Sequence, residues 1–236
     1  MALPFFYIES YDSTQPNIIL DEDTSKHVVQ VLRMKVGEKI NLTDGKGSLL
    51  TCIIDDDNKK RCSVRITESI NQQQATRNIT IAISLIKNNS RFEWFLEKAT
   101  EIGVSEIIPL ICERTEKQKF RIERMQGILI SAMLQSQQSL LPVLHEPVSF
   151  QKIVAQSDQQ QKFIAHCIDD TKANLASLVN QSLHSQIILI GPEGDFTKQE
   201  IETAIQHHFI PVTLGETRLR TETAGMVAAA LLKITA

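Results

Sequence analysis

The residue types best suited to chemistry lie in two short segments near the end of the sequence. The first is the turn Gly191-Pro192-Glu193-Gly194, which follows the apolar run Ile187–Ile190. Its glycines let a flat ligand approach the backbone without a Cβ in the way, and its proline stiffens the turn. A tight connection between a strand and a helix, with the Glu193 carboxylate bonded to helix N–H groups, would show the same pattern.

The second segment, Leu214–Ala224, also follows an apolar strand and leads into a helix. Arg218 and Arg220 alternate with Leu219, so one face is apolar and the other carries guanidinium groups. Thr221 is the expected N-terminal cap of the helix. A planar guanidinium can stabilise negative charge that develops on a ligand oxygen, although ordinary surface arginines would look alike.

Two such loops at the C-terminal ends of consecutive strands are expected to lie side by side at the rim of a sheet, where α/β proteins bind ligands. Backbone N–H and C=O groups would line the cleft, which suits a purine read through main-chain hydrogen bonds. The sequence has no G-x-G-x-x-G after a strand and no G-x-x-x-x-G-K-[ST]. It therefore lacks the usual signatures of dinucleotide and triphosphate sites.

The cysteines are scattered, without CxxC spacing or a nearby pair of histidines. They are Cys52, Cys62, Cys112 and Cys167. We expect reduced, mostly buried thiols and no metal site.

Charge and hydropathy limit the partners of the chain. Its 236 residues carry a net charge of −3, so they present no long-range positive field, and RNA binding would depend on local patches. The best candidate is the basic run Arg114–Arg124, although such a run is more often a solvated helix face.

No apolar stretch approaches the roughly 20 residues of a membrane span, and the first residues lack a secretory signal. A cytosolic protein is expected.

The pattern changes near residue 70, which predicts two domains joined by the polar segment Ile70–Asn78. The first domain is expected to be a small β-barrel-like module with one helix, Ser25–Met34. Its expected strands are Phe5–Glu9, Lys39–Thr43, Leu49–Asp55 and Arg61–Thr67.

Strands and helices alternate in the second part, which predicts an α/β domain with a parallel sheet covered on both faces. The expected strands are Ile79–Ile86, Glu106–Cys112, Lys162–Cys167, Gln186–Ile190 and Ile210–Leu214. The expected helices are Ser90–Ile102, Phe120–Gln137, Phe150–Gln156, Lys172–Asn180, one that starts at Thr197, and Thr221–Ile234.

These loops belong to a pattern that covers nearly the whole chain. Its further parts are His27–Arg33, the turn Asp44–Gly47 and the run Lys98–Val104, and its most specific part is Leu-Gly-x-x-Arg-Leu-Arg-Thr-Glu-Thr-Ala from Leu214. The pattern resembles the SPOUT-superfamily methyltransferases that methylate uridine at N3 in 16S ribosomal RNA of the small subunit.

The resemblance implies a C-terminal SPOUT domain, residues 73–236, with a parallel sheet and a trefoil knot. It implies an N-terminal PUA-like β-barrel domain, residues 1–72, that binds RNA. Because true knots are rare, the knot follows from the resemblance alone. Also implied are S-adenosyl-L-methionine as cofactor, small-subunit ribosomal RNA or an assembled subunit as partner, a homodimer and a cytoplasmic location, without membrane or metal.

The same resemblance places residues in the reaction. Uridine N3–H is a weak acid that must lose its proton, so Arg220 is expected to stabilise charge on a uracil oxygen, and Glu193 to accept the proton or orient the base. Because N3 lies on the pairing edge, the base must be unpaired or flipped. Cofactor binding is expected from Leu189, Ile190, Gly191, Pro192, Gly194, Leu214, Gly215, Leu219, Thr221, Thr223 and Ala224. RNA contacts are expected from His27, Arg33, Lys46, Lys87, Arg91 and Arg114.

Three features depart from the family pattern. The start, Leu3-Pro4, lacks an arginine beside the first strand. Leu134 and Gln138 replace a glutamate and an arginine around Gln135-Ser136, and Asp195 replaces a glycine.

Two other functions stay open. A 2′-O-ribose methyltransferase would use similar loops, but the whole-chain match and the absence of an added basic tail favour uridine N3. A catalytically silent RNA-binding or ribosome-assembly protein would fit the substitutions Leu134 and Gln138 and the acidic net charge.

Overall fold

The computed structural model describes residues 3–73, 77–116, 119–168 and 172–234. The chain forms two compact units: Met1–Gln74 with Met133–Leu141, and Ala75–Ala132 with Pro142–Ala236. The first unit therefore includes a segment that lies far along the chain, unlike the contiguous division expected from the sequence. Three of the residues at the expected boundary, 74–76, lie outside the described part.

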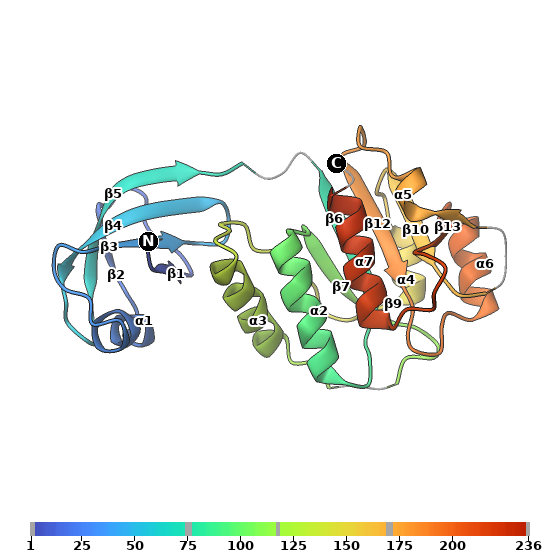
Figure 1. Ribbon diagram of the computed structural model, residues 1–236, viewed down its shortest axis with the longest axis horizontal. Coiled ribbons are helices and arrows are strands. Elements are labelled where there is room, and N and C mark those ends of the chain that lie inside the picture. The colour runs from blue at the N-terminus through green and yellow to red at the C-terminus, as the bar shows by residue number, and fades with distance from the viewer. Residues whose placement is uncertain (1–2, 74–76, 117–118, 169–171, 235–236) are drawn as a thin grey trace. The chain divides into compact units, whose positions relative to one another are not determined.

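The first unit is built on a sheet that curls into a half-barrel (Figure 1). Its strand order is β1-β3-β4-β5-β2, with β1 parallel to β3 and the other pairs antiparallel. The strands are β1 (Phe5–Tyr7), β2 (Asn17–Ile19), β3 (Lys39–Thr43), β4 (Ser48–Asp56) and β5 (Ser63–Asn71). Alternate residues of β3 and β4, such as Ile40, Leu42, Leu50 and Ile54, are fully buried in its apolar core.

The helix expected over Ser25–Met34 is wrong in its start and its type. An α-helix, α1 (Glu22–Lys26), begins after Asp21, whose side chain accepts a hydrogen bond from Thr24 N–H. A π-helical turn, η1 (His27–Val31), continues it. Arg33 follows with a φ of 56°, in the left-handed region. Such backbone is uncommon for a residue with a side chain and is found often at functional sites.

The segment Met133–Leu141 is held in the first unit by hydrogen bonds to the turn between β3 and β4 and to Gln72, which follows β5. Gly47 N–H donates to Ser139 O at 2.9 Å, and Ser139 Oγ donates to Gln72 Oε1 at 2.7 Å. Leu140 pairs with Lys46 in an isolated antiparallel bridge. The Gln135-Ser136 block and its neighbours Leu134 and Gln138 therefore lie with the β-rich unit.

The second unit contains a parallel sheet of order β11-β13-β10-β12-β6-β7-β8, with β9 also paired to β7. This confirms the predicted α/β class. The strands are β6 (Asn78–Ser84), β7 (Glu106–Ile111), β8 (Val143–Leu144), β9 (Val148–Ser149), β10 (Gln161–Ala165), β11 (Ala173–Asn174), β12 (Ser185–Ile190) and β13 (Ile210–Thr213). The two-residue strands β8, β9 and β11 were not expected, because they are too short to show periodicity.

Helices cover both faces of this sheet (Figure 1). The helices of this unit are α2 (Asn89–Ile102), α4 (Phe150–Gln156), α5 (Leu175–Leu178), α6 (Lys198–Gln206) and α7 (Thr221–Ile234). A further helix, α3 (Ile122–Gln135), begins in this unit, and its last residues, from Met133, belong to the first unit. The alternation of side chains divides the core: Ile187 and Leu189 pack towards α4 and α6. On the other face α7 contacts β6, β12 and α2.

Gly225 permits the close packing of α7. A Cβ at this position would lie 2.7 Å from Ile83 Cδ1 and 2.7 Å from a ring carbon of Phe95, both in fully buried side chains. We expect Gly225→Ala to lower the free energy of unfolding by about 1–3 kcal/mol through overpacking, measured by urea denaturation.

The matched control is Gly127→Ala in α3, where a Cβ would meet no atom within 4 Å. Removing a helical glycine there should stabilise by up to about 1 kcal/mol. Equal stability of the Gly225→Ala variant and the parent would contradict this account of how α7 packs.

Candidate active site

The candidate site lies at the C-terminal ends of three strands, β12, β10 and β13. The strands β12 and β13 are not neighbours, because β10 lies between them and pairs with both. The loops that follow β12 and β13 nevertheless meet, as expected, because both line one hollow and a hydrogen bond from Thr221 to Gly191 joins them. Consecutive strands of a parallel sheet need not be adjacent, since each crossover can pass a strand already in place. The loop after β10 therefore joins the two motif-bearing loops at this rim, and its residues Ala165 and Cys167 line both hollows described below.

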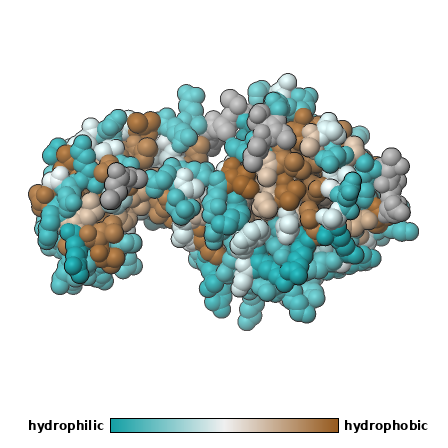
Figure 2. Space-filling model, viewed as in Figure 1, coloured by the Kyte–Doolittle hydropathy of each residue, from teal (hydrophilic) through white to brown (hydrophobic). Residues whose placement is uncertain are grey.

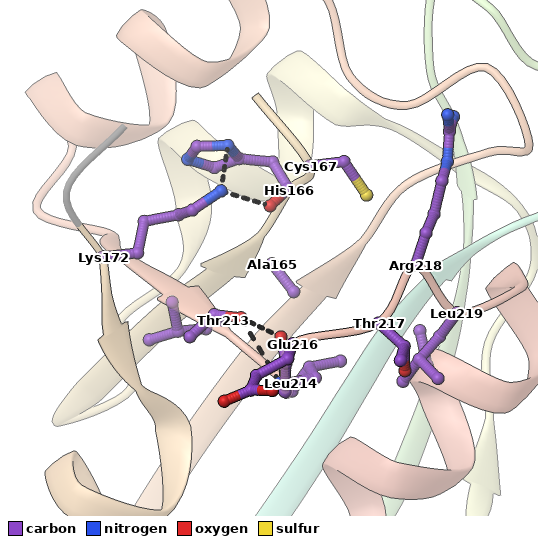
Figure 3. A pocket seen from close by; sticks show the side chains of 13 residues that line it. Ala165, His166, Cys167, Lys172, Thr213, Leu214, Glu216, Thr217, Arg218 and Leu219 are labelled. Atoms are coloured by element: carbon purple, nitrogen blue, oxygen red, sulfur yellow. Dashed lines mark hydrogen bonds between the residues drawn. The ribbon is translucent and has the colours of Figure 1, made fainter. Parts of the chain in front are cut away.

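Two hollows open at this rim and share part of their lining. The first, of about 360 Å³, is lined by Ala165, His166, Cys167, Lys172, Val212, Thr213, Leu214, Gly215, Glu216, Thr217, Arg218, Leu219 and Ala224 (Figure 3). The second, of about 350 Å³, is lined by Arg91, Ala165, Cys167, Ile190, Gly191, Pro192, Glu193, Asp195, Arg218, Leu219, Arg220, Thr221, Glu222 and Ala224. Both volumes lie in the range of small-ligand sites.

The loop after β10 is the part of the site that sequence reasoning missed. Lys172 Nζ donates to His166 O at 2.7 Å and to Ile168 O at 2.6 Å, and Figure 3 shows the ammonium directed at His166. These bonds draw the two ends of the loop together and fix Cys167 on the wall shared by both hollows. No motif marks this loop, so only its place in the sheet identifies it.

Asp195, one of the three expected departures from the family pattern, suits the conformation of its turn. Its φ is 62°, in the left-handed region, which aspartate tolerates better than most residues with a side chain. Its carboxylate accepts hydrogen bonds from Cys167 N–H at 2.8 Å and from Phe196 N–H at 2.9 Å. Asp195 therefore ties the loop after β12 to the loop after β10.

Three further contacts hold the Gly191–Gly194 turn. Arg114 Nη1 donates to Gly194 O at 2.6 Å, and the backbone N–H of Lys87 donates to Glu193 Oε1 at 3.3 Å. Thr221 Oγ1 donates to Gly191 O at 3.0 Å in a buried position. This bond joins the loops after β12 and β13. Thr221 is the first residue of α7, so the expectation that it is the N-terminal cap of this helix is wrong.

The structure brings the two predicted catalytic residues into one hollow. Glu193 and Arg220 are both exposed and both line the second hollow. Arg220 immediately precedes α7, and its carbonyl accepts the Ala224 N–H at 2.8 Å. The backbone at Arg220 is therefore fixed, while the guanidinium is accessible from solvent.

Most of the predicted cofactor residues line one or both hollows. They are Ile190, Gly191, Pro192, Leu214, Gly215, Leu219, Thr221 and Ala224. Leu189, Gly194 and Thr223 do not line them: Leu189 is fully buried in the core, and Gly194 packs against Arg114.

The two glycines of the predicted loops face different surroundings. A Cβ at Gly215 would meet no atom within 4 Å, whereas a Cβ at Gly191 would lie 3.1 Å from the buried Phe196 ring. Only Gly215 opens a free approach to the backbone. A valine at Gly191 would press on the buried Phe196 ring, so Gly191→Val is expected to disturb the core as well as the ligand site.

Glu222 is a further carboxylate of this hollow, to which the sequence assigned no role. It is 7% exposed and lies in the first turn of α7. Its Oε1 is 3.7 Å from Nε of Arg91, a predicted RNA-binding residue that lines the same hollow. The pair places one buried anion and one half-exposed cation beside Arg220.

The other predicted RNA-binding residues fall into two groups. Lys87 and Arg114 lie beside the Gly191–Gly194 turn, where Lys87 Nζ also pairs with Glu116 Oε2 at 3.3 Å. His27, Arg33 and Lys46 lie in the first unit. Phe6 meets the His27 ring edge to face at a centroid distance of 5.6 Å.

The thiols partly match expectation. Cys52, Cys62 and Cys112 are buried, and burial raises the pKa of Cys112 to about 12. Cys167 is exposed.

Within the described ranges, no cluster of His, Cys, Asp and Glu side chains could hold a metal ion. In the same part of the chain, no helix is both long and apolar enough to cross a membrane.

Two family models match the chain. Residues 72–233 match the RNA methyltransferase domain, and residues 20–67 match the RNA methyltransferase PUA domain. Together with the parallel sheet and its three-loop rim, these matches define the class of protein as an RNA methyltransferase that carries a PUA domain.

Relatives narrow the class. The chain is 28% identical to ribosomal RNA small subunit methyltransferase E of Rickettsia conorii, over 97% of this chain and 94% of that one. A probable rRNA-methyltransferase of Porphyromonas gingivalis is 36% identical over 98% of this chain and 99% of that chain, with a TM-score of 0.90. The small subunit methyltransferase E of Neisseria gonorrhoeae, solved with S-adenosyl methionine, is 30% identical over 99% and 98%, with a TM-score of 0.88. The chain belongs to this ribosomal RNA small subunit methyltransferase family, which confirms the resemblance found in the sequence.

Proposed function

We propose that the protein transfers a methyl group from S-adenosylmethionine to N3 of a uridine in small-subunit (16S) ribosomal RNA. The observation that carries this proposal is the pair of joined hollows, one open to the backbone at Gly215 and the other lined by Arg220 and Glu193. Relatives named for small-subunit RNA methylation support the substrate class.

The first hollow fits the cofactor. Apolar side chains of Ala165, Leu214, Leu219 and Ala224 provide walls, and the open backbone at Gly215 leaves room for a flat base. We place the cofactor along these residues and the wall shared with the second hollow. When bound, it supplies an electrophilic methyl group on a sulfonium.

The second hollow supplies groups for the uracil. Arg220 donates hydrogen bonds to the uracil oxygen on which charge develops as N3 loses its proton. Glu193 receives that proton or orients the base, and its exposed position gives the proton a path to water. The target base enters unpaired, because a paired N3 is inaccessible.

The direct test is the ribosomal RNA of a strain that lacks the gene. Mass mapping of its small-subunit RNA should show the loss of a single N3-methyluridine, restored by the purified protein and S-adenosylmethionine. Loss of a 2′-O-methyl group instead would establish the alternative reaction. An unchanged modification pattern, together with RNA binding, would indicate the catalytically silent protein.

The two units are proposed to divide the work, with RNA docking on the first and the cofactor on the second. We expect Arg33→Ala with Lys46→Ala to weaken RNA binding, most at low salt where phosphate contacts count most, and to lower the salt slope by about 1 per lost contact. Fluorescence anisotropy with small-subunit RNA measures this. Titration with S-adenosylmethionine should be unchanged; an equal loss of both affinities would refute the division.

We further propose that the protein acts in the cytoplasm as a homodimer with a knotted SPOUT domain. Hydrophobic side chains gather over α7 (Figure 2), where Met226, Val227 and Ala230 are partly exposed, and Trp94 on neighbouring α2 is 40% exposed. An apolar surface of this kind is typical of an interface between subunits. Light scattering should give twice the mass of the chain, and a monomer would exclude the dimer.

A further inference from the structure

A third hollow, of about 290 Å³, lies beside the N-terminal turn of α2 in the second unit. It is lined by Asn89, Ser90, Glu93, Lys119, Arg121, Arg124 and Met125. Three of these side chains are cations and one is an anion, in a chain whose net charge is −3. The lining of this hollow is therefore positively charged, although the chain as a whole is negatively charged.

The contacts divide these charges unevenly. Arg124 forms two hydrogen bonds with Glu93, from Nε to Oε1 at 2.7 Å and from Nη2 to Oε2 at 3.0 Å. This fork lowers the pKa of Glu93 and leaves it ionised, so it neutralises Arg124. Among the described residues, Lys119 and Arg121 have no ion-pair partner. Both are exposed, and the hollow keeps about two uncompensated positive charges.

The basic run Arg114–Arg124 is thus more than one solvated face. Arg114 holds the Gly194 carbonyl of the active-site turn, and Arg124 holds Glu93. Of the cations of this run that the structure describes, Lys119 and Arg121 remain available to a ligand. Guanidinium and ammonium groups placed together in a hollow favour phosphate oxygens, which accept several charge-assisted hydrogen bonds at once.

This basic hollow adjoins the proposed uracil site. Ser90 lines the basic hollow, and the next residue, Arg91, lines the hollow that contains Arg220 and Glu193. Residues of the first turn of α2 therefore line both hollows. Since all these residues belong to the second unit, the fold of one unit fixes their spacing.

We propose that the basic hollow binds backbone phosphates of the RNA strand next to the target nucleotide, while the target base lies across the first turn of α2 in the uracil site. This inference rests on the proposed function. A base turned out of its stack leaves its flanking phosphates exposed, and two cations at a fixed distance hold the strand in register. Lys119 and Arg121 are therefore positioning residues for the RNA.

The experiment uses two double variants. The test variant combines Lys119→Ala and Arg121→Ala, and the control, which changes the net charge equally, combines Lys152→Ala and Lys198→Ala. The control lysines are exposed and lie outside all three hollows. The probe is a fluorescent single-stranded oligouridylate, titrated at 50, 100 and 200 mM salt. The second readout is methyl transfer to undermethylated small subunits.

The double variant should lower the slope of log K against log salt by about 1.4, since each single-strand phosphate contributes about 0.7. Its KM for subunits should rise several-fold more than its kcat falls, and its affinity for S-adenosylmethionine should stay that of the parent. Glu93→Gln should instead increase the salt slope and the RNA affinity. It removes the carboxylate that neutralises Arg124, and so it adds an uncompensated cation to the hollow.

An unchanged salt slope, or an equal change in the control, would overturn the inference and leave the hollow to another partner, such as an acidic protein. A parent that methylates no uridine would refute the proposed function separately. In that case a reduced salt slope in the double variant would still support an RNA-binding hollow.

Discussion

Replacing Arg220 with alanine is expected to lower the kcat of methyl transfer by about 100-fold or more while hardly changing the affinity for S-adenosylmethionine. Charge develops on the uracil only as N3 loses its proton, so a donor that binds this charge acts in the transition state and not in the ground state. The structure favours this role. Arg220 lines the uracil hollow, its backbone is fixed at the start of α7, and its side chain is exposed.

Arg220→Lys should restore little of the rate, because an ammonium is a point charge and lacks the planar fork of donors. Rates should be measured on undermethylated small subunits, with calorimetric titration of the cofactor in parallel. Arg218→Ala is the comparison, since Arg218 is an exposed neighbour that lines both hollows. If both Arg220 variants turn over within a few-fold of the parent, Arg220 is a structural residue and the role passes to Arg218 or to the RNA.

Gly215→Val is expected to weaken the binding of S-adenosylmethionine by about tenfold or more, equivalent to at least 1.4 kcal/mol. Gly215 has a φ of 140°, which residues with a side chain rarely adopt, and the branched side chain would enter the open space of the first hollow. Calorimetry measures the affinity, and thermal denaturation reports whether the variant is folded.

Gly37→Val is the matched control for backbone strain. Gly37 has a φ of 91° and equally open surroundings, but it lies in the first unit. Each substitution should lower stability by roughly 1–3 kcal/mol through its backbone conformation, and only Gly215→Val should reduce cofactor affinity. Unchanged affinity in the Gly215→Val variant would remove the loop after β13 from the cofactor site.

The sequence by itself determined the class of the second unit, most of its elements and the two motif-bearing loops. These features are local. Strands buried on both faces give continuous apolar runs, and helix ends carry their own stop and start residues. Gly103 ends α2 in the left-handed conformation. The Thr197 and Glu200 capping box begins α6, with both of its hydrogen bonds formed.

Only the tertiary structure decided which segments meet. Strand order is not encoded within a strand, so the place of β10 between β12 and β13, and with it the roles of Cys167 and Lys172, could not be read from periodicity. For the same reason, the sequence could not predict that Met133–Leu141 belongs to the first unit: the contacts that hold this segment join residues far apart in the chain. The hydroxyl of Thr221 shows the limit most clearly: its sequence position predicts a cap, but the carbonyl of Gly191, thirty residues earlier, lies within reach only after folding.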